Sequence, residues 1–172
     1  MRITKQHVFF WDGWLSNWHP AEIKIETGEE TLEFSNSEQL FVYLKAISFA
    51  DEQTAKKILK DGSDPKKAKA LGREVKNYDE LEWRKDRERA MFQACYNKFK
   101  QNKDLRDKLL DKRFDGLHFV EGSPYDKVWG IGIHFNAASD DESTWQGENL
   151  LGKVLDQVRD ELKKDLASGT EK

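Results

Sequence analysis

Between residues 35 and 80 the chain carries four helix-start signals in close succession, and this feature constrains the fold more than any other. Ser35 and Glu38 have the S-x-x-E spacing of a capping box, which predicts a helix from there to about Phe49. Three more helix starts are marked by an aspartate, a residue that caps helices well: Asp51, Asp64 and Asp79. The middle of the chain is therefore predicted to be helical.

The segments on either side contain short strands. Val8–Trp11 is followed by Asp-Gly, which is typical of a strand that runs into a turn. A pair of strands is predicted at residues 22–26 and 31–34, with a glycine between them, and another short strand at Leu117–Val120. These strands are too few and too short for more than a small sheet.

The helix that Asp79 begins and two further helices complete the expected fold. The longest helix is predicted at about residues 79–100, where the following side chains lie near one face: Trp83, Arg87, Met91, Cys95 and Phe99. A short helix is expected at residues 105–110, and a last one with this core stripe: Leu151, Val154, Leu155, Val158 and Leu162. No strand–helix alternation repeats, so we predict an α+β fold, a mostly helical single domain with a small β-sheet.

The composition fits one domain in a reducing compartment. With 172 residues, 37% of them hydrophobic, we expect a single domain over residues 1–166 and a flexible tail over residues 167–172. No apolar run reaches the roughly 18–20 residues of a membrane span, and the start lacks the apolar stretch of a signal peptide. The single cysteine suits a reducing environment, so we expect a cytoplasmic protein with no membrane association.

The helix predicted at Glu38–Phe49 places a lysine among aromatic side chains. Because seven residues make almost two turns, Phe41, Lys45 and Phe49 fall on one face, and Glu38 lies about 10 Å along the axis from Lys45. An amine that loses hydration has a lowered pKa, and its neutral form can attack an electrophile. The alternative is a lysine that extends to water, with Glu38 serving only as the capping-box glutamate.

A second candidate feature is a basic stretch at Lys56–Lys76, with eight Lys or Arg and three acids, a local balance of +5. Such a stretch can meet phosphate groups, although a solvated helix surface gives the same pattern. Arg73 follows Gly72 at a helix end, where a guanidinium can bind a phosphate through two nitrogens. The formal net charge of the whole chain is −3, which argues against a general polyanion binder.

A third candidate feature is the segment from Glu121 to Gly130, which is rich in turn residues and is expected to form a loop. It offers two carboxylates, Glu121 and Asp126, and a carboxylate pair suits acid–base chemistry at a glycosidic bond. Trp129 stands beside Gly130 and could stack on a base. A purely structural role for this loop stays open.

Metal and cofactor motifs are absent from the sequence. The four histidines are scattered without metal-ligand spacing, and no phosphate-binding glycine motif is present. We therefore predict no metal and no cofactor. Cys95 lies on the apolar stripe of its helix, which favours a packed thiol over a nucleophile.

Several short motifs occur in one order along the chain: Leu15-Ser16-Asn17-Trp18, Phe34-Ser35-Asn36-Ser37-Glu38, Lys45-Ala46, Ala70-Leu71-Gly72-Arg73, Trp83, Lys98-Phe99-Lys100-Gln101-Asn102, Val120-Glu121-Gly122-Ser123-Pro124-Tyr125-Asp126, Trp129-Gly130-Ile131-Gly132 and Trp145-Gln146-Gly147-Glu148-Asn149-Leu150-Leu151-Gly152. Each is weak alone. Their order and spacing resemble the NADAR (YbiA-like) family from about Phe10 to Leu162.

This resemblance implies an N-glycosidase that acts on ADP-ribose-type or ribosylamine-type substrates. Some relatives remove ADP-ribose from guanine bases in nucleic acid, which would make ADP-ribosylated DNA a substrate. Others are associated with phosphoribosylamino-pyrimidine intermediates of riboflavin biosynthesis. The family contains stand-alone enzymes as well as partners of ADP-ribosyltransferase toxins, and for this chain a pairing with such a toxin stays open beside the stand-alone alternative.

The resemblance also implies roles for individual residues. The family's key carboxylate and lysine correspond to Glu38 and Lys45, with Lys45 forming a Schiff base at the ribose C1 and with Glu38 and Asp126 moving protons. The implied substrate-binding residues are Ser16, Asn17, Arg73, Trp83, Glu121, Trp129, Gly130 and Asn149. One position departs from the family pattern: Gln39 stands where many relatives have a histidine or tyrosine after the glutamate.

Three other interpretations stay open from the sequence. The chain could be an N-glycosidase of riboflavin intermediates, with a compact phosphate site near Arg73 and no nucleic-acid surface. It could be a non-catalytic module that binds ADP-ribose or NAD, in which case Lys45 would be exposed and titrate normally. A purely structural helical adaptor fits poorly with Glu38, Lys45 and the Trp129–Gly130 loop occurring together.

Overall fold

The computed structural model describes residues 1–169 and divides into two compact units. The first unit combines Met1–Ser16 with Asp104–Lys172, and the second is Asn17–Lys103. The last helix ends at Ala167, so the predicted tail begins inside it, while residues 170–172 lie outside the described residues. None of the described helices combines the length and the apolar character that crossing a membrane requires.

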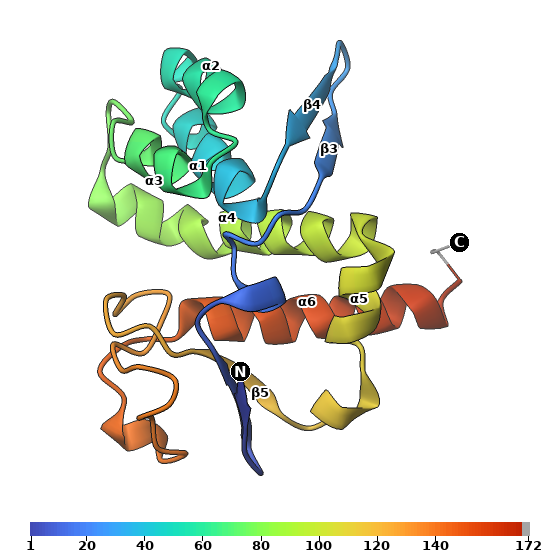
Figure 1. Ribbon diagram of the computed structural model, residues 1–172. Coiled ribbons are helices and arrows are strands. Elements are labelled where there is room, and N and C mark those ends of the chain that lie inside the picture. The colour runs from blue at the N-terminus through green and yellow to red at the C-terminus, as the bar shows by residue number, and fades with distance from the viewer. Residues whose placement is uncertain (170–172) are drawn as a thin grey trace. The chain divides into compact units, whose positions relative to one another are not determined.

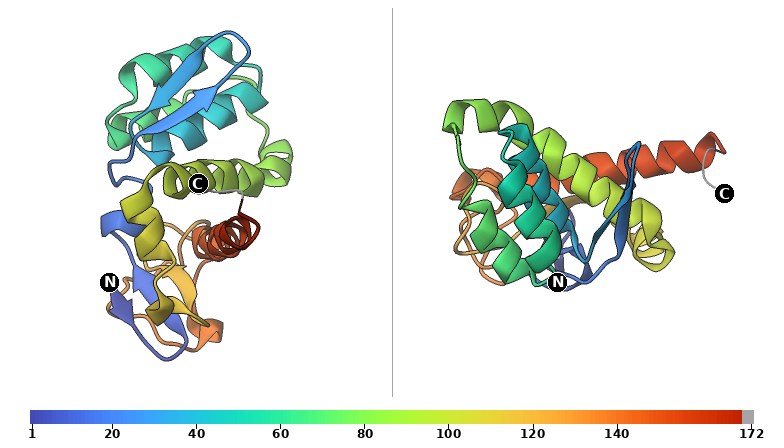
Figure 2. Two further views of the ribbon diagram at one scale, coloured as in Figure 1. Left: turned by 90° about the vertical axis from the view of Figure 1, so that its right-hand side faces the viewer. Right: turned by 90° about the horizontal axis from the view of Figure 1, so that it is seen from above.

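The second unit is built from a hairpin and four helices (Figure 1). Its strands β3 (Ile23–Glu26) and β4 (Thr31–Phe34) are antiparallel, with Ile23 opposite Phe34. The helices are α1 (Ser37–Ser48), α2 (Glu52–Asp61), α3 (Pro65–Gly72) and α4 (Glu80–Gln101). α1 packs against each of the other three helices, and the hairpin lies against α1 and α2 (Figure 2). Little of α1 is therefore left to solvent.

The helix starts of the second unit follow the predicted aspartates, with one exception. Asp51, Asp64 and Asp79 each accept a hydrogen bond from a backbone N–H in the first turn of their helix. The prediction that Ser35 and Glu38 form the capping box of α1 is wrong. Asn36 is the cap instead, because its side chain accepts from Gln39 N at 2.8 Å, and Gln39 Oε1 accepts from Ser35 N at 2.8 Å.

The first unit contains a three-stranded sheet covered by the last helix. Its strands are β1 (Arg2–Ile3), β2 (His7–Phe10) and β5 (His118–Glu121), in the order β1-β2-β5, with β2 and β5 parallel. α6 (Leu150–Ala167) packs on β5. Short 3-10 turns occur at Gly13–Leu15, Lys112–Phe114 and Glu142–Thr144, and α5 (Lys103–Leu109) links the two units along the chain.

The architecture confirms the predicted α+β class, with six α-helices and little sheet among the described residues. The core of the first unit includes fully buried aromatic side chains from the parallel strands β2 and β5: Phe9, Phe10 and Phe119. In the second unit, apolar residues of α1 and α4 such as Leu40, Val42 and Met91 are buried. The core of the second unit holds α1, α3 and α4 together, and these helices carry the candidate residues Glu38, Lys45 and Arg73.

Candidate functional site

Lys45 projects from α1 toward the end of α3 in the second unit. Its Nζ donates a hydrogen bond to the carbonyl oxygen of Gly72 at 2.9 Å. The same nitrogen lies 4.7 Å from the centroid of the Tyr78 ring. The side chain is half-buried, so the prediction that Lys45 extends freely to water does not hold.

One aromatic ring, that of Tyr78, lies over the Lys45 amine, and it belongs to a cluster of contacting rings that includes both phenylalanines of α1. Phe41 and Trp83 have ring centroids 5.6 Å apart, and Phe49 lies 6.1 Å from Trp83 and 5.5 Å from Tyr78. The rings come from α1, from the start of α4 and from the segment before α4. Of these groups, the Tyr78 ring lies against the amine and the Gly72 carbonyl accepts its hydrogen bond.

The surroundings of Lys45 lower the pKa of its amine. Burial lowers the pKa of Lys45 from its ordinary value, and the charge of Arg73 lowers it further. The carboxylates of Glu80 and Glu38 oppose these effects and raise the pKa, but the net direction is down. A larger fraction of neutral amine is therefore present near neutral pH than for a solvated lysine.

Gly72 is needed for the contact with Lys45 because there is no room for a side chain at this position. A Cβ there would lie 2.7 Å from Val42 Cγ1 on α1. The glycine lets the last turn of α3 approach α1 closely enough for its carbonyl to meet Lys45. Arg73 follows immediately as the C-cap residue of α3, and its side chain is exposed.

Glu38 occupies the first turn of α1 and is 9% exposed. Glu38 was predicted to take part in capping α1, but the capping hydrogen bonds are made by the side chains of Asn36 and Gln39 instead. The backbone of Glu38 is held by Asn17, whose carbonyl oxygen accepts from Glu38 N at 3.2 Å. The buried carboxylate of Glu38, whose charge raises the pKa of Lys45, is therefore not used in capping α1.

Asn17 uses its side chain within the protein. Its Nδ2 donates to Met91 Sδ at 3.1 Å, and its Oδ1 accepts from Ser37 Oγ at 2.9 Å. This arrangement ties the start of α1 to α4, so Asn17 helps to position Glu38. Its contact with substrate stays a prediction.

Sequence reasoning missed Tyr78 and Glu80. The Tyr78 hydroxyl donates to Glu80 Oε2 at 2.7 Å, and Arg84 Nε donates to Glu80 Oε1 at 3.1 Å. Tyr78 is 44% exposed, whereas Trp83, which the resemblance implies to bind substrate, is 7% exposed and packed between Phe41 and Phe49. No pattern along one helix reveals Tyr78, because it reaches Lys45 from a separate turn that follows Asn77 with φ of 63°.

The first unit holds the other predicted residues, and most of them lie in the loop between β5 and α6. Asp126 Oδ1 accepts from Val128 N at 2.9 Å and from Trp129 N at 2.8 Å. Asp126 therefore shapes the turn that carries Trp129, and its role in moving protons stays a prediction. Ser16 ends the first 3-10 turn, donating its backbone N–H to Gly13 O, and is half-buried.

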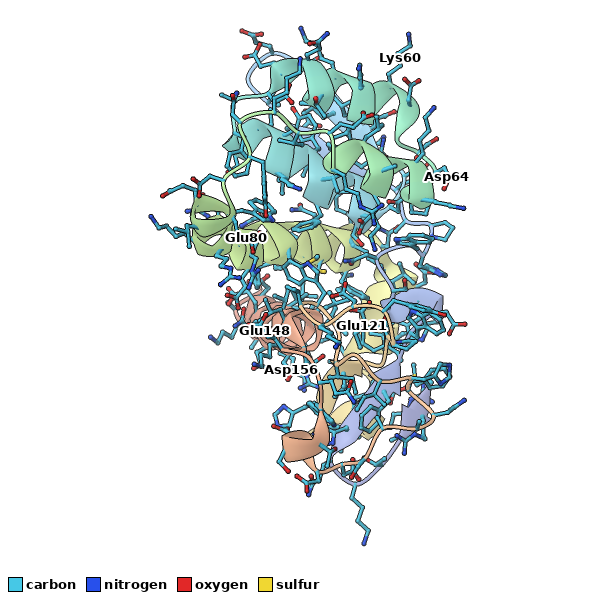
Figure 3. The ribbon with its side chains drawn as sticks, turned by 90° about the vertical axis from the view of Figure 1, so that its left-hand side faces the viewer. Lys60, Asp64, Glu80, Glu121, Glu148 and Asp156 are labelled. Carbon is cyan, nitrogen blue, oxygen red and sulfur yellow. The ribbon has the colours of Figure 1, made fainter. Side chains whose placement is uncertain are left out.

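Glu121, Gly130 and Asn149 meet at the end of β5. Asn149 Oδ1 accepts from Glu121 N at 3.0 Å, and its Nδ2 donates to Phe119 O at 3.1 Å. A Cβ on Gly130 would lie 2.9 Å from the carbonyl oxygen of Glu121 and 3.3 Å from its Oε2. The Trp-Gly motif thus has a packing reason, and Asn149 fastens the loop to the strand. Figure 3 labels Glu121 within this unit.

A cavity of about 340 Å³ in the second unit lies away from Lys45. None of the predicted site residues lines it; its walls come from Glu22, Ile23, Lys24, Glu33, Phe34, Ser35, Gln39, Leu59 and Ser63. Nor does any group of three His, Cys, Asp or Glu among residues 1–169 have the arrangement of a metal site. The groups that act on the Lys45 amine are carboxylates, a guanidinium and the Tyr78 ring.

Several known proteins are similar to this chain in sequence or structure. Protein irg-1 of Caenorhabditis elegans is 39% identical over 174 residues, covering 92% of this chain and 81% of that protein. N-glycosidase R617 of Acanthamoeba polyphaga mimivirus is 39% identical, covering 90% of this chain and 87% of that protein. The NMR structure of the E. coli protein YbiA superposes with a TM-score of 0.73 at 26% identity, covering 96% of this chain and 90% of that chain. The NADAR domain matches residues 9–163, and the chain therefore belongs to the NADAR family.

Proposed function

We propose that this protein is an N-glycosidase that hydrolyses a ribose C1–N bond and that its substrate is ADP-ribose attached to guanine in nucleic acid. The observation that carries the proposal is the half-buried Lys45, whose amine lies against the Tyr78 ring and donates a hydrogen bond to a backbone carbonyl. The similarity to a protein named N-glycosidase supports the reaction class. Pairing with an ADP-ribosylating toxin is part of the same proposal, because such a toxin would supply the substrate.

The proposed reaction begins with opening of the ribose ring. The nitrogen of the base pushes electrons toward C1, the C1–O4′ bond breaks, and Glu38 gives its proton to O4′. The lone pair of neutral Lys45 then attacks C1, and the proton released from the amine returns through Glu38 to the leaving nitrogen. The C1–N bond to the base breaks and a Schiff base between Lys45 and C1 remains.

Water completes the cycle. A water molecule attacks C1 and gives one proton to Asp126 or Glu38. The O–H proton of the resulting carbinolamine then passes to the lysine nitrogen, the C1–N bond to Lys45 breaks, and the sugar leaves as the C1 aldehyde with Lys45 restored as the free amine. The contact with Gly72 suits this route, since a neutral amine can donate one N–H to the carbonyl while keeping its lone pair for C1. The lowered pKa of Lys45 supports the same conclusion, because burial disfavours the ammonium form, which has no lone pair.

Turnover tests this proposal directly. The wild type, Lys45→Ala and a control variant, Lys85→Ala, are incubated with guanine-ADP-ribosylated DNA, and released ADP-ribose is measured by mass spectrometry. Lys85 is exposed on α4 and pairs only with Glu82 in its own helix, so its loss should not matter. We expect release by the wild type and the control and none by Lys45→Ala. Normal release by Lys45→Ala would contradict the covalent route.

Reduction provides evidence for the intermediate itself. Borohydride added during turnover should convert the Schiff base to a stable secondary amine, with the added mass on the peptide containing Lys45. Wild-type protein that releases ADP-ribose without ever forming this adduct would indicate direct attack by water. In that case Lys45 would serve only as an electrostatic group.

A second candidate substrate is a phosphoribosylamino-pyrimidine of riboflavin biosynthesis. It is supported by a relative from Vibrio vulnificus named riboflavin biosynthesis protein VVA0006, which is 28% identical over 165 residues. The match covers 93% of this chain but 40% of that protein. The two substrates are assayed in parallel, and release of ribose phosphate from the pyrimidine alone would favour this candidate. Binding of ADP-ribose without release from either substrate would indicate a non-catalytic module.

A further inference from the structure

Helices α2 and α3 carry a surface of basic side chains that the proposed reaction does not use. Seven of them are exposed on the two helices: Lys56, Lys57, Lys60, Lys66, Lys67, Lys69 and Arg73. Among the described residues, none of the seven lies within 4.0 Å of a carboxylate oxygen. On α4, by contrast, Arg84, Lys85 and Arg89 each pair with an acid of the same helix.

The basic residues of α3 form a stripe, which we call the α3 stripe: Lys66, Lys69 and Arg73. Their spacing of three and seven residues puts them on one helical face over about 10 Å. The stripe ends at Arg73, next to the Gly72 carbonyl that binds Lys45. The charge of Arg73 is also felt at Lys45, where it lowers the pKa of the amine. A row of positive charges therefore leads to the proposed nucleophile.

The charge distribution favours a polyanion over other partners. The stretch Lys56–Lys76 has a balance of +5, whereas the whole chain has a net charge of −3, so positive charge is concentrated on these helices. The exposed large apolar side chains of the described residues lie elsewhere, and none is on α2 or α3. A membrane-bound helix or a stable protein interface needs an apolar centre, which this surface lacks. Figure 3 shows Lys60 at the outer end of α2.

We propose that the α3 stripe, with the neighbouring lysines of α2, binds the sugar–phosphate backbone of the nucleic-acid strand that carries the modified base. This inference rests on the proposed function and specifies its substrate as a polymer. Phosphates flanking the adduct lie along Lys66 and Lys69, while Arg73 is nearest the reacting sugar. The contacts are sequence-independent, because they involve the backbone and not the base edges.

The test uses a double charge reversal, Lys66→Glu with Lys69→Glu, and leaves Arg73 in place. The matched control reverses Lys5 and Lys153, two exposed lysines of the first unit, and changes the net charge by the same amount. For each protein kcat/KM is measured on an ADP-ribosylated single-stranded oligonucleotide and on ADP-ribosylated guanosine. Circular dichroism and thermal melting verify that each variant is folded.

We expect the α3 variant to lose about tenfold or more in kcat/KM on the oligonucleotide at about 50 mM salt and to fall less at about 200 mM. Its activity on the nucleoside should stay within about twofold of the wild type, because each contact removed is to a phosphate beyond the adduct. An equal loss on both substrates, no loss on either, or the same loss in the control variant would overturn the inference.

Binding separates this inference from the proposed function. If the wild type turns over neither substrate, affinity for an unmodified fluorescent oligonucleotide is measured by anisotropy, with phosphatidylserine vesicles tested in parallel. Salt-dependent binding of the oligonucleotide that the α3 variant weakens and the control retains would support the surface without catalysis. Binding to the vesicles alone, or to neither, would reject it.

Discussion

The Nζ of Lys45 donates a hydrogen bond to the carbonyl oxygen of Gly72 at 2.9 Å. A carbonyl has no charge, so it orients the amine without holding it in the ammonium form as a carboxylate partner would. The contact depends on how closely the end of α3 approaches α1, and therefore on the absence of a side chain at Gly72. The packing of α3 against α1 and the orientation of the Lys45 amine are thus linked.

Substituting Gly72 by alanine should disturb both packing and activity. The new Cβ would lie 2.7 Å from Val42 Cγ1, and relieving such an overlap typically costs about 1–3 kcal/mol of stability. Moving α3 away also moves the carbonyl from Lys45, so kcat should fall. Gly28→Ala is the control, because no atom lies within 4 Å of its added Cβ. Urea unfolding and turnover measure the effects, and equal behaviour of the two variants would contradict this reading.

Glu80 and Arg73 should shift the pH dependence of the reaction in opposite directions. Neutral Lys45 is the reactive form, so kcat/KM rises with pH through the lysine pKa. Glu80 raises that pKa, so Glu80→Gln should move the rise to lower pH, and Arg73→Gln should move it to higher pH. The Glu38 carboxylate and the Tyr78 ring remain near the amine in both variants. Profiles that shift together, or not at all, would count against an amine nucleophile.

Tyr78 should act as a positioning residue for Lys45. Tyr78→Phe keeps the ring over the amine but removes the hydroxyl that donates to Glu80, so the carboxylate is no longer fixed. We expect Tyr78→Phe to alter the pH profile with a small loss of kcat, and Tyr78→Ala to lower kcat about tenfold or more because water reaches the amine. Borohydride trapping should yield less adduct in Tyr78→Ala. A change in KM alone in both variants would indicate a role in substrate binding instead.

Two substitutions of Asp126 should distinguish its structural role in the loop from its proposed role in proton transfer. Its Oδ1 accepts two backbone N–H groups of the loop, and an asparagine oxygen can accept both as well. Asp126→Asn should therefore keep the melting temperature while turnover falls about tenfold or more, because the amide cannot take up a proton. Asp126→Ala should lose both stability and turnover. If Asp126→Asn is fully active and only Asp126→Ala is impaired, the residue only shapes the loop.

Lys98 should make stability depend on pH. It is fully buried on α4, and burial lowers its pKa from 10.5 to about 8, while the neighbouring Cys95 opposes the shift. Between these values the unfolded chain holds one more proton than the folded protein, so the free energy of unfolding rises with pH across this window and the gain is lost below about 8.

The size of the effect is measured against Lys98→Met, which cannot titrate. From pH 8 to 10.5 the wild type should gain on the order of 3 kcal/mol relative to the variant, since each pKa unit corresponds to about 1.4 kcal/mol. Urea unfolding at several pH values gives the difference, and tyrosine titration cancels because both proteins share it. Parallel stability curves for the two proteins would show that Lys98 is not titrating in this range.

The sequence predicted the elements of the fold well where local chemistry decides them. The aspartates before α2, α3 and α4 cap those helices because a short acidic side chain reaches the first-turn amides wherever the chain places it. The cap of α1 was assigned one residue too early, because Ser35-Asn36-Ser37 offers several side chains that can cap. Only the backbone conformation decides among them, and Asn36 with φ of −166° is the residue that fits.

The candidate site was predictable only along α1. Helical periodicity places Phe41, Lys45 and Phe49 on one face, and in the structure both phenylalanines belong to an aromatic cluster whose Tyr78 ring lies over the lysine amine. Tyr78 comes from a turn more than thirty positions later, and no local pattern links it to Lys45. The family resemblance implies that Asn149 binds substrate; the structure shows its amide hydrogen-bonded to the backbone of β5, and the contact with substrate stays a prediction. Its burial at 5% exposure could be read only from the folded chain.

The acceptor for Lys45 is a main-chain atom, and this has a consequence for how the protein can diverge. No single substitution of a side chain on α3 can delete that acceptor, because every amino acid supplies the same carbonyl. The exposed side chains of α3 can therefore be substituted as substrates change without loss of this hydrogen bond, provided that Gly72 keeps α3 close to α1. We expect relatives with different specificities to vary along α3 while the lysine keeps the same resting partner.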